Sequence, residues 1–343
     1  MSSKWYLDKG AENDIILSTR IRLARNLSGF PFPNRIDPQT QTDINRRVRD
    51  AVISGNSVIA GEFTYFELNT MPPAERGALL EHHLISPELA GAGEGKALLL
   101  SADHAVSIML GEEDHVRIQV LSSGENLRQA YELAEKIDSL LDHELHFAFD
   151  DRLGYLTECP TNLGTGLRAS LMLHLPAIES LGAMGQLISS VSKIGLTIRG
   201  TFGEGTRVKG SLYQLSNQVT LGISEENAIE NLKSIAGQII AQERSLREKF
   251  NMDELSDKVY RSLGILQNAR LLTSDEMMDL LSNVRLGVSM NIISGIDLAK
   301  INQLQNEAGS ATLTQAAHET LDAPARDKRR SEIARDIMKP QKG

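Results

Sequence analysis

Cysteine is nearly absent from this chain, because Cys159 is the only one among its 343 residues. A single thiol excludes an internal disulfide framework and suits a reducing compartment. Long hydrophobic runs are missing as well, since no apolar stretch approaches the roughly 18 residues that a membrane-spanning helix needs. The N-terminus lacks the charged and then apolar pattern of a secretory leader. Together these absences predict a soluble cytoplasmic protein that makes no membrane contact.

The chain also lacks an excess of positive charge, since its formal net charge is −9 at pH 7. A negative overall field argues against direct nucleic-acid binding. The charge is unevenly placed, because residues 325–343 carry seven Lys or Arg and only three acids, which leaves the remaining 324 residues at −13. A phosphate site in the body of the chain must therefore come from a local cluster of arginines.

The common nucleotide-binding motifs are missing too. The chain has no GxxxxGK[ST] loop, no GxGxxG after a strand, and no Asp-Phe-Gly motif. Each of these motifs marks a known way of holding nucleotide phosphates or their metal ion. If the protein binds a nucleotide, it uses a different arrangement.

Hydrophobic patterning predicts two structurally different parts. With 41% hydrophobic residues the chain can build a large core. Alternating apolar residues predict strands at 15–25 and within 97–121, and helical periodicity predicts a helix within 122–145. From residue 252 onward the pattern is wholly helical. We therefore expect an α+β domain over 1–250 and a helical domain over 251–343, which is small enough to need docking or pairing with a second copy.

The segment from Glu158 to Ser170 contains the lone cysteine, followed at once by a proline and then by two glycines. Leu167, Leu171 and Leu175 recur every four residues, which predicts a helix that begins after the second glycine. Unpaired N–H groups at a helix start attract anions, and Arg168 would add donors suited to phosphate. A lone cysteine by itself is more often a small buried hydrophobe.

This segment closely resembles the Cys-Pro-(Thr/Ser)-Asn-hydrophobic-Gly-Thr signature of phosphagen (guanidino) kinases. Further resemblances lie at Ser18–Arg22, which matches the family's Ser-x-Arg-x-Arg element, and at Glu112–Arg117, which matches Glu-Glu-Asp-His-x-Arg. Arg199–Glu204 is similar to the family's Arg-Gly-Thr-Arg-Gly-Glu loop. The resemblance implies the fold of that family, an α+β catalytic domain in which helices flank a large antiparallel sheet.

The resemblance also implies that the chain binds ATP with Mg²⁺. The ATP-binding residues that it implies are Ser18, Thr19, Arg20, Ile21, Arg22, His83, Arg117, Arg168, Ala169, Ser170, Arg199, Gly200, Thr201, Phe202, Gly203 and Glu204. The metal would be held mainly by phosphate oxygens and water. We expect no protein metal site, because the adjacent His82 and His83 do not face one another on a helix and no second ligand cluster accompanies them.

Three residues are candidates for the chemistry. In the family, the second glutamate of the Glu-Glu-Asp-His element contacts the guanidinium substrate, which implies that Glu113 is a hydrogen-bonding clamp and general base. Cys159 would hold and polarise the guanidinium as a thiolate. Phe202 stands where the family has an arginine, and Arg207 stands near the place of a later glutamate, so Glu204 is our candidate for the second catalytic carboxylate.

The order of the parts resembles bacterial protein arginine kinases of the McsB type. The Arg-x-Arg strand begins by residue 18, so no helical domain precedes it, and helices follow the catalytic part instead. This resemblance implies protein substrates with accessible arginines, an activator protein, and a Clp-type unfoldase-protease as the destination of marked proteins. It also implies a role in stress response and protein quality control, and a homodimer or larger oligomer.

The tail segment Arg326–Ser331 resembles the Arg-Asp-x-x-Arg-Ala element of the same family. That resemblance implies an allosteric pocket for phosphoarginine made by Arg326, Asp327, Arg330 and Ser331. On a helix, Arg326 and Arg330 would share a face and could clamp one phosphate. A solvated basic helix end explains the same charge pattern without a pocket.

Two other functions remain open at this point. A kinase for small guanidino compounds would share the same catalytic motifs. A phosphoarginine-binding adaptor with a degenerate active site would explain Phe202 and Arg207 without catalysis.

Overall fold

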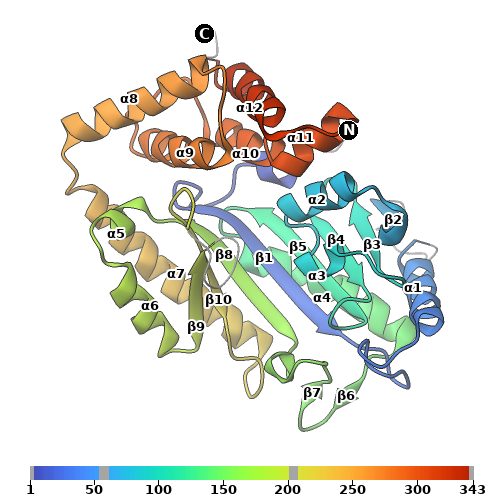
Figure 1. Cartoon of the computed structure of the whole chain (residues 1–343). Coiled ribbons are helices and arrows are strands. Elements are labelled where there is room, and N and C mark those ends of the chain that lie inside the picture. The colour runs from blue at the N-terminus through green and yellow to red at the C-terminus, as the bar shows by residue number, and fades with distance from the viewer. Residues whose placement is uncertain (1–3, 54–61, 201–207, 340–343) are drawn as a thin grey trace.

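The computed structural model of the chain describes residues 4–53, 62–200 and 208–339. Its centre is an eight-stranded sheet in the order β2-β3-β4-β5-β1-β8-β10-β9, and every neighbouring pair is antiparallel (Figure 1). The strands are β1 (Ile16–Arg25), β2 (Phe63–Glu67), β3 (Ala97–Ser101), β4 (Val106–Leu110), β5 (Val116–Ser123), β8 (Leu167–His174), β9 (Leu196–Gly200) and β10 (Leu212–Asn217). The expected α+β fold with a large antiparallel sheet is confirmed.

Strand β1 lies in the middle of this sheet, between β5 and β8. Ile21 and Leu23 are almost fully buried in the main core, whereas Arg20 and Arg22 alternate with them and are only partly buried. Because successive side chains of a strand point to opposite faces, the arginines lie on the face away from that core. The central strand therefore presents two guanidinium groups on one side and hydrophobic side chains on the other.

Helices cover the two faces of the sheet unequally. The main core is closed by α1 (Pro38–Ile53), α4 (Leu127–Leu145), α6 (Met184–Ser192) and α7 (Glu225–Arg247). On the other face α2 (Pro73–Glu81) and α3 (Pro87–Ala90) pack over the half that contains β3 and β4 (Figure 1). The short elements are η1 (Trp5–Leu7), η3 (Leu68–Thr70), η4 (Pro160–Asn162), α5 (Pro176–Ser180), β6 (Phe149–Asp150) and β7 (Gly154–Tyr155). On this face, the half of the sheet that contains β1, β8 and β10 lies beside α2 and can accommodate a binding site.

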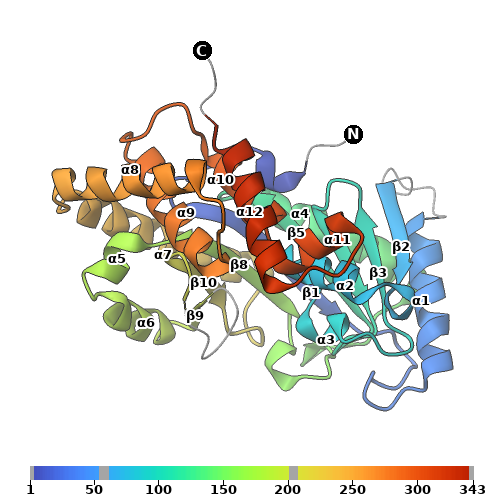
Figure 2. The same ribbon diagram turned by 45° about the horizontal axis from the view of Figure 1, so that its top comes forward.

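The C-terminal part is helical, as its periodicity predicts. It comprises α8 (Met252–Asn268), α9 (Ser274–Ser289), α10 (Leu298–Glu307), α11 (Ser310–Ala317) and α12 (Ala323–Ile337). These helices enclose a hydrophobic cluster of their own that includes Val259, Leu281 and Leu304. Helix α11, which the sequence did not lead us to expect, lies against α2, and α10 lies against η1 (Figure 1, Figure 2). The C-terminal helices therefore pack against the sheet-containing part of the chain, through α2 and η1.

The helix that we expected after the two glycines is wrong, because Leu167–His174 is strand β8. A repeat of four residues is also a multiple of two, so the leucine spacing fits a strand as well as a helix. Leu167, Leu171 and Leu173 are fully buried in the main core. The turn after Cys159 is the three-residue η4, so no long helix directs its N–H groups at this site.

Candidate active site

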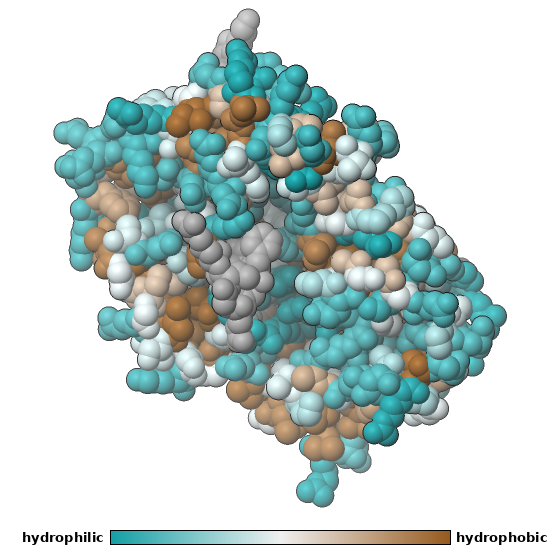
Figure 3. Space-filling model, viewed as in Figure 1, coloured by the Kyte–Doolittle hydropathy of each residue, from teal (hydrophilic) through white to brown (hydrophobic). Residues whose placement is uncertain are grey.

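Five arginines from four strands line one cavity of about 530 Å³ on the face away from the main core. Arg22 on β1 lies directly opposite Arg168 on β8, and Arg20 lies opposite Ser170 two residues along. Arg117 on β5 and Arg199 on β9 complete the group. Figure 3 shows a hydrophilic hollow in the middle of this side of the molecule. The sheet thus brings together all five arginines that the sequence singled out.

Neighbouring side chains hold several of these guanidinium groups in place. Arg117 Nη1 lies 2.5 Å from Glu112 Oε2, and the Glu112 side chain is only 2% exposed. Arg20 Nη2 donates a hydrogen bond to Gln214 Oε1 at 2.5 Å. Arg22 Nε is buried and has no hydrogen-bond partner within the described part of the chain. A buried donor without a partner costs free energy, which an added acceptor would recover.

Burial and mutual repulsion both make the positive charges of this cavity unfavourable. Burial, together with the charges of Arg168 and Arg117, lowers the pKa of Arg20 to about 10. Burial, followed by the charge of Arg20, holds the pKa of Arg22 well below its usual value. Like charges that are gathered in a poorly solvated site destabilise one another. A bound polyanion would convert that repulsion into attraction, so the cavity suits a group such as a triphosphate.

His83 lies at the edge of this cavity, two residues beyond the end of α2. Its φ is +58°, in the left-handed region, and its carbonyl oxygen accepts a hydrogen bond from Gln119 Nε2 at 2.8 Å. Burial, with a smaller contribution from the charge of Arg20, lowers the pKa of His83 to about 4. The imidazole is therefore neutral near pH 7 and adds no further positive charge to the cavity.

Glu113 and Cys159 lie on two neighbouring turns that hydrogen bonds hold together. Asn162 Nδ2 donates to Glu113 Oε1 at 3.1 Å. The Glu158 amide donates to Asp114 Oδ1 at 2.8 Å, and Asp114 is fully buried. Glu113 Oε2 also lies 3.6 Å from Arg117 Nη2, which connects this pair of turns to the arginine cavity. The side chain of Glu113 is 39% exposed, so a ligand can reach it.

Some residues in the expected ATP-binding set do not direct their side chains into the cavity. Thr19, Ile21 and Ala169 are fully buried, and the strand period places them on the opposite face from Arg20, Arg22 and Arg168. Ser18 lines a small neighbouring pocket instead of the arginine cavity. Gly200 lines the cavity itself. Thr201, Phe202, Gly203, Glu204 and Arg207 lie outside the described residues.

The sequence did not identify the polar residues that orient the arginines and Glu113. Glu112 pairs with Arg117, Gln214 binds Arg20, and Asn162 binds Glu113. Gln214 is the hardest to foresee, because β10 is separated from β1 by nearly 200 residues of sequence and the strand order alone brings them near. Asn162 lies in the Cys-Pro-Thr-Asn motif, and Glu112 lies in the Glu-Glu-Asp-His motif. Both could therefore have been recognised from their positions in the sequence.

The tail residues are arranged differently from our expectation of a paired clamp. Arg330 is 1% exposed, and it donates to the carbonyl oxygens of Leu272 and Ala308, each at 2.9 Å. It also donates to Asp327 Oδ1 at 2.6 Å, and Ser331 is buried as well. Only Arg326 lines a second cavity, of about 770 Å³, between α2 and α11. Arg326 therefore faces this cavity, whereas Arg330 is buried and bonded to acceptors of the protein itself.

The described residues contain neither a grouped set of metal ligands nor a helix suited to a membrane. Within residues 4–53, 62–200 and 208–339, no three His, Cys, Asp or Glu side chains are grouped in a way that could hold a metal ion. Over the same ranges, no helix combines the length and the apolar character that crossing a bilayer requires.

Comparison with known proteins agrees with the motifs and the fold. Residues 43–246 match the family model of the ATP:guanido phosphotransferase C-terminal catalytic domain, and residues 252–342 match the model of the protein-arginine kinase McsB C-terminal domain. A protein-arginine kinase of Halothermothrix orenii is 45% identical over 96% of this chain and 95% of its own length. One from Moorella thermoacetica is 45% identical over 98% and 97%.

Solved structures show the same fold. Lombricine kinase superimposes with a TM-score of 0.62 at 23% identity, over 74% of each chain. A duplicated taurocyamine kinase from Schistosoma mansoni, with bound transition-state analogue components, gives a TM-score of 0.61 at 26% identity over 74% of this chain and 39% of its own. The resemblance that the motifs indicated is confirmed: the chain belongs to the protein-arginine kinase family of ATP:guanido phosphotransferases.

Proposed function

We propose that this protein is an ATP-dependent protein arginine kinase, which transfers the γ-phosphoryl group of ATP to the guanidinium of arginine side chains in proteins. The observation that carries the proposal is the cavity in which five arginines meet directly beside the turns that bear Glu113 and Cys159. Phosphoryl transfer needs alignment and neutralised charge more than covalent help from the protein. A cluster of guanidinium groups next to an accessible carboxylate supplies both.

The arginine cavity is the ATP site in this proposal. Arg20, Arg22, Arg117, Arg168 and Arg199 hold phosphate oxygens through their planar forks, and Arg22 Nε gains an acceptor that the described residues do not supply. Bound Mg²⁺ would neutralise phosphate charge and orient the terminal phosphate, with water completing its coordination. Glu112 and Gln214 keep Arg117 and Arg20 directed into the cavity before the nucleotide arrives.

Glu113 and Cys159 act on the acceptor. A guanidinium has a pKa above about 12 and is a poor nucleophile while protonated. Glu113, held by Asn162, accepts a proton from the attacking nitrogen as the N–P bond forms and the bond to the leaving phosphate oxygen breaks. Cys159 contacts the guanidinium electrostatically and forms no covalent bond. Glu204 is our candidate for the second carboxylate.

The acceptor is an arginine of a protein in this proposal. The names of the relatives support it, because the curated proteins that match this chain along nearly its whole length are called protein-arginine kinases. We propose further that phosphorylated clients pass to a Clp-type unfoldase-protease, that an activator protein and self-association tune the enzyme, and that it works in the cytoplasm during stress.

The second cavity is our candidate for phosphoarginine regulation. Arg326 would bind the phosphate, and the acidic residues Glu75, Glu81 and Glu319 that share the lining would favour the guanidinium. Asp327, which is partly exposed, pairs with the buried Arg330 on α12, and Arg330 also binds the carbonyl oxygen of Leu272. Their role in this proposal is to support the pocket wall.

Labelling with γ-phosphate tests the proposed activity against its two rivals. Wild-type protein should incorporate acid-labile phosphate into a folded protein substrate, and Glu113→Gln should incorporate almost none. A phosphoarginine-binding adaptor would give no labelling with either protein. A small-guanidine kinase would phosphorylate free arginine efficiently and leave the protein substrate unlabelled, which would contradict our proposal.

A further inference from the structure

Glu81, the last residue of α2, connects the sheet-containing part of the chain to the C-terminal helices. Its carboxylate caps the start of α11, since Oε1 accepts from the Ala311 amide at 2.8 Å. Oε2 accepts from the Thr312 amide at 2.9 Å and from Thr312 Oγ1 at 2.8 Å. The first N–H groups of a helix have no partner within the helix, so this one side chain satisfies donors that α11 leaves open.

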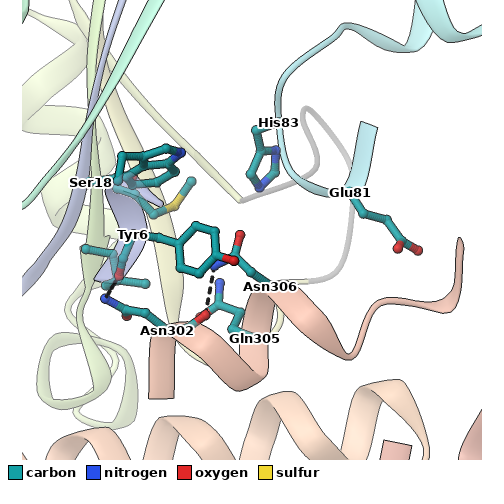
Figure 4. A pocket seen from close by; sticks show the side chains of 10 residues that line it. Tyr6, Ser18, Glu81, His83, Asn302, Gln305 and Asn306 are labelled. Atoms are coloured by element: carbon teal, nitrogen blue, oxygen red, sulfur yellow. Dashed lines mark hydrogen bonds between the residues drawn. The ribbon is translucent and has the colours of Figure 1, made fainter. Parts of the chain in front are cut away.

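The next two residues continue the connection toward the arginine cavity. His82 Nε2 contacts the carbonyl oxygen of Asn306, at the end of α10, at 2.9 Å. His83 then adopts its left-handed φ of +58° and lines the arginine cavity. Figure 4 shows Glu81 and His83 on the same stretch of chain, with Asn306 on the facing helix. Three consecutive residues thus contact α11, α10 and the arginine cavity in turn.

Two glycines allow this close approach of α2 and α11. A Cβ on Gly77 would lie 2.7 Å from Ala311 Cβ, and a Cβ on Gly309 would lie 2.2 Å from Glu81 Oε2. Neither distance is possible without a shift of the neighbouring atoms. Gly309 has a φ of −62°, which any residue adopts, so an alanine there would disturb the Glu81 carboxylate while the backbone stays unstrained.

We propose that Glu81 is a positioning residue for the arginine cavity. By capping α11 it fixes the turn that carries His83, so the affinity of the cavity for ATP depends on the C-terminal helices. A left-handed conformation at a non-glycine residue is strained and persists only where its surroundings enforce it. Glu81 also lines both the arginine cavity and the second cavity that contains Arg326, which places it where a ligand of one cavity affects the other. This inference rests on the proposed ATP site.

Direct binding of MgATP by calorimetry tests the inference. Glu81→Ala should raise the dissociation constant on the order of 5- to 150-fold, the usual range for coupling between sites. Gly309→Ala should raise it in the same direction. The double variant should bind no more weakly than Glu81→Ala alone, because both changes remove the same contact. In turnover assays the loss should appear in KM for ATP, with kcat largely retained.

Three further variants complete the design. Glu81→Gln keeps an oxygen that can accept from α11 and should restore part of the affinity. Thr273→Ala removes a helix cap from α9, in the same helical part but away from α2, and should leave MgATP binding unchanged. Arg22→Ala removes a phosphate contact and should abolish binding. Thermal unfolding of each variant confirms that the measured protein is folded.

The outcomes separate the two proposals. If wild-type protein binds MgATP and Arg22→Ala does not, but both Glu81→Ala and Gly309→Ala bind as the wild type does, the positioning role of Glu81 is wrong and the ATP site stands. If wild-type protein binds no MgATP, the ATP site itself fails and the role of Glu81 fails with it.

Discussion

At the scale of single residues, the arginine cavity lowers the stability of the ATP-free protein and favours the binding of an anion. Arg22 lies opposite Arg168, and its Nε is buried without a partner among the residues that the structure describes. Burial and the neighbouring positive charges together keep its pKa well below the usual value. Such an arrangement is unfavourable in the empty protein and becomes favourable only when an anion enters.

Replacing Arg22 should therefore change stability and binding in opposite directions. Arg22→Met removes a buried charge from a repulsive cluster and should raise the free energy of unfolding of the ATP-free protein by roughly 0.5–2 kcal/mol. The same variant should lose measurable MgATP binding. Urea unfolding and calorimetry measure the two effects. A variant that is less stable than the wild type would show that Arg22 supports the fold instead.

Cys159 should matter for transfer more than for stability. Its Sγ contacts Thr161 Oγ1 at 3.0 Å, and its side chain is not part of the hydrophobic core. Cys159→Ser should change the free energy of unfolding by no more than about 0.5 kcal/mol. The transfer rate should fall on the order of 10²-fold if the sulfur of Cys159 stabilises the guanidinium. Equal loss of rate and stability would return this cysteine to a structural role.

At the scale of elements, the spacing of apolar residues predicted an element correctly only where it matched either the helical or the strand period and not both. Strand β1 and helix α4 are confirmed, because their apolar residues repeat with only one period over a long stretch. Strand β8 was expected to be a helix, because its leucine spacing fits both periods. Its identity depends on pairing with β1 and β10, which a local pattern does not contain.

In the candidate site, too, local patterns predicted some features, while the pairing of distant strands determined others. Arg20, Arg22 and Arg117 were predicted from short motifs, and the strand period fixes the face on which they lie. The contact between Arg20 and Gln214 was not predictable, because β1 and β10 lie on either side of β8 and only the order of the strands brings the two side chains together. No sequence pattern indicated that Glu81 caps α11, since its partners Ala311 and Thr312 lie some 230 residues away.

Buried histidines at the ends of elements should make the fold sensitive to mild acid. Burial lowers the pKa of His83, after α2, to about 4 and holds the pKa of His174, at the end of β8, well below 6.5. The unfolded chain therefore binds protons that the folded chain does not, and stability rises with pH in this range. We expect the free energy of unfolding to fall progressively as the pH is lowered from about 6.5 to about 5.

Urea unfolding at four pH values between about 7.5 and about 5 measures this dependence. Asp114 and Asp138, whose pKa values burial raises, act in the opposite direction at lower pH, so the comparison stays above about pH 5. A stability profile that is flat or rising toward acid would contradict the assignment of His83 and His174 as neutral in the folded protein.

At the scale of the whole molecule, the helical part contacts the sheet-containing part through α11 on α2 and α10 on η1, and also through α9, where Ser282 Oγ lies 2.8 Å from His174 Nε2. The second cavity lies at the first of these contacts, between α2 and α11. Arg326 faces it, while Asp327 and Arg330 pair behind it. In our proposal, a ligand in this cavity would influence the neighbouring arginine cavity through Glu81, which lines both.

The two tail residues should consequently behave differently when replaced. Arg326→Gln should leave the fold intact and remove any response of kinase activity to added phosphoarginine. Asp327→Ala removes the anionic partner of the buried Arg330, which keeps its bonds to the carbonyl oxygens of Leu272 and Ala308, and should destabilise the protein by about 1–3 kcal/mol. Thermal unfolding and activity with and without phosphoarginine measure both effects. An unchanged response in Arg326→Gln would remove this cavity as the regulatory site.

The most direct test of the whole account is to identify the residue type that gains phosphate. Wild-type protein is incubated with MgATP and a folded protein substrate, and the products are mapped by mass spectrometry under neutral conditions that preserve N–P bonds. We predict phosphate on arginine side chains with the wild type and none with Glu113→Gln. Phosphate on serine, threonine or tyrosine, or equal labelling of arginine by both proteins, would contradict the account.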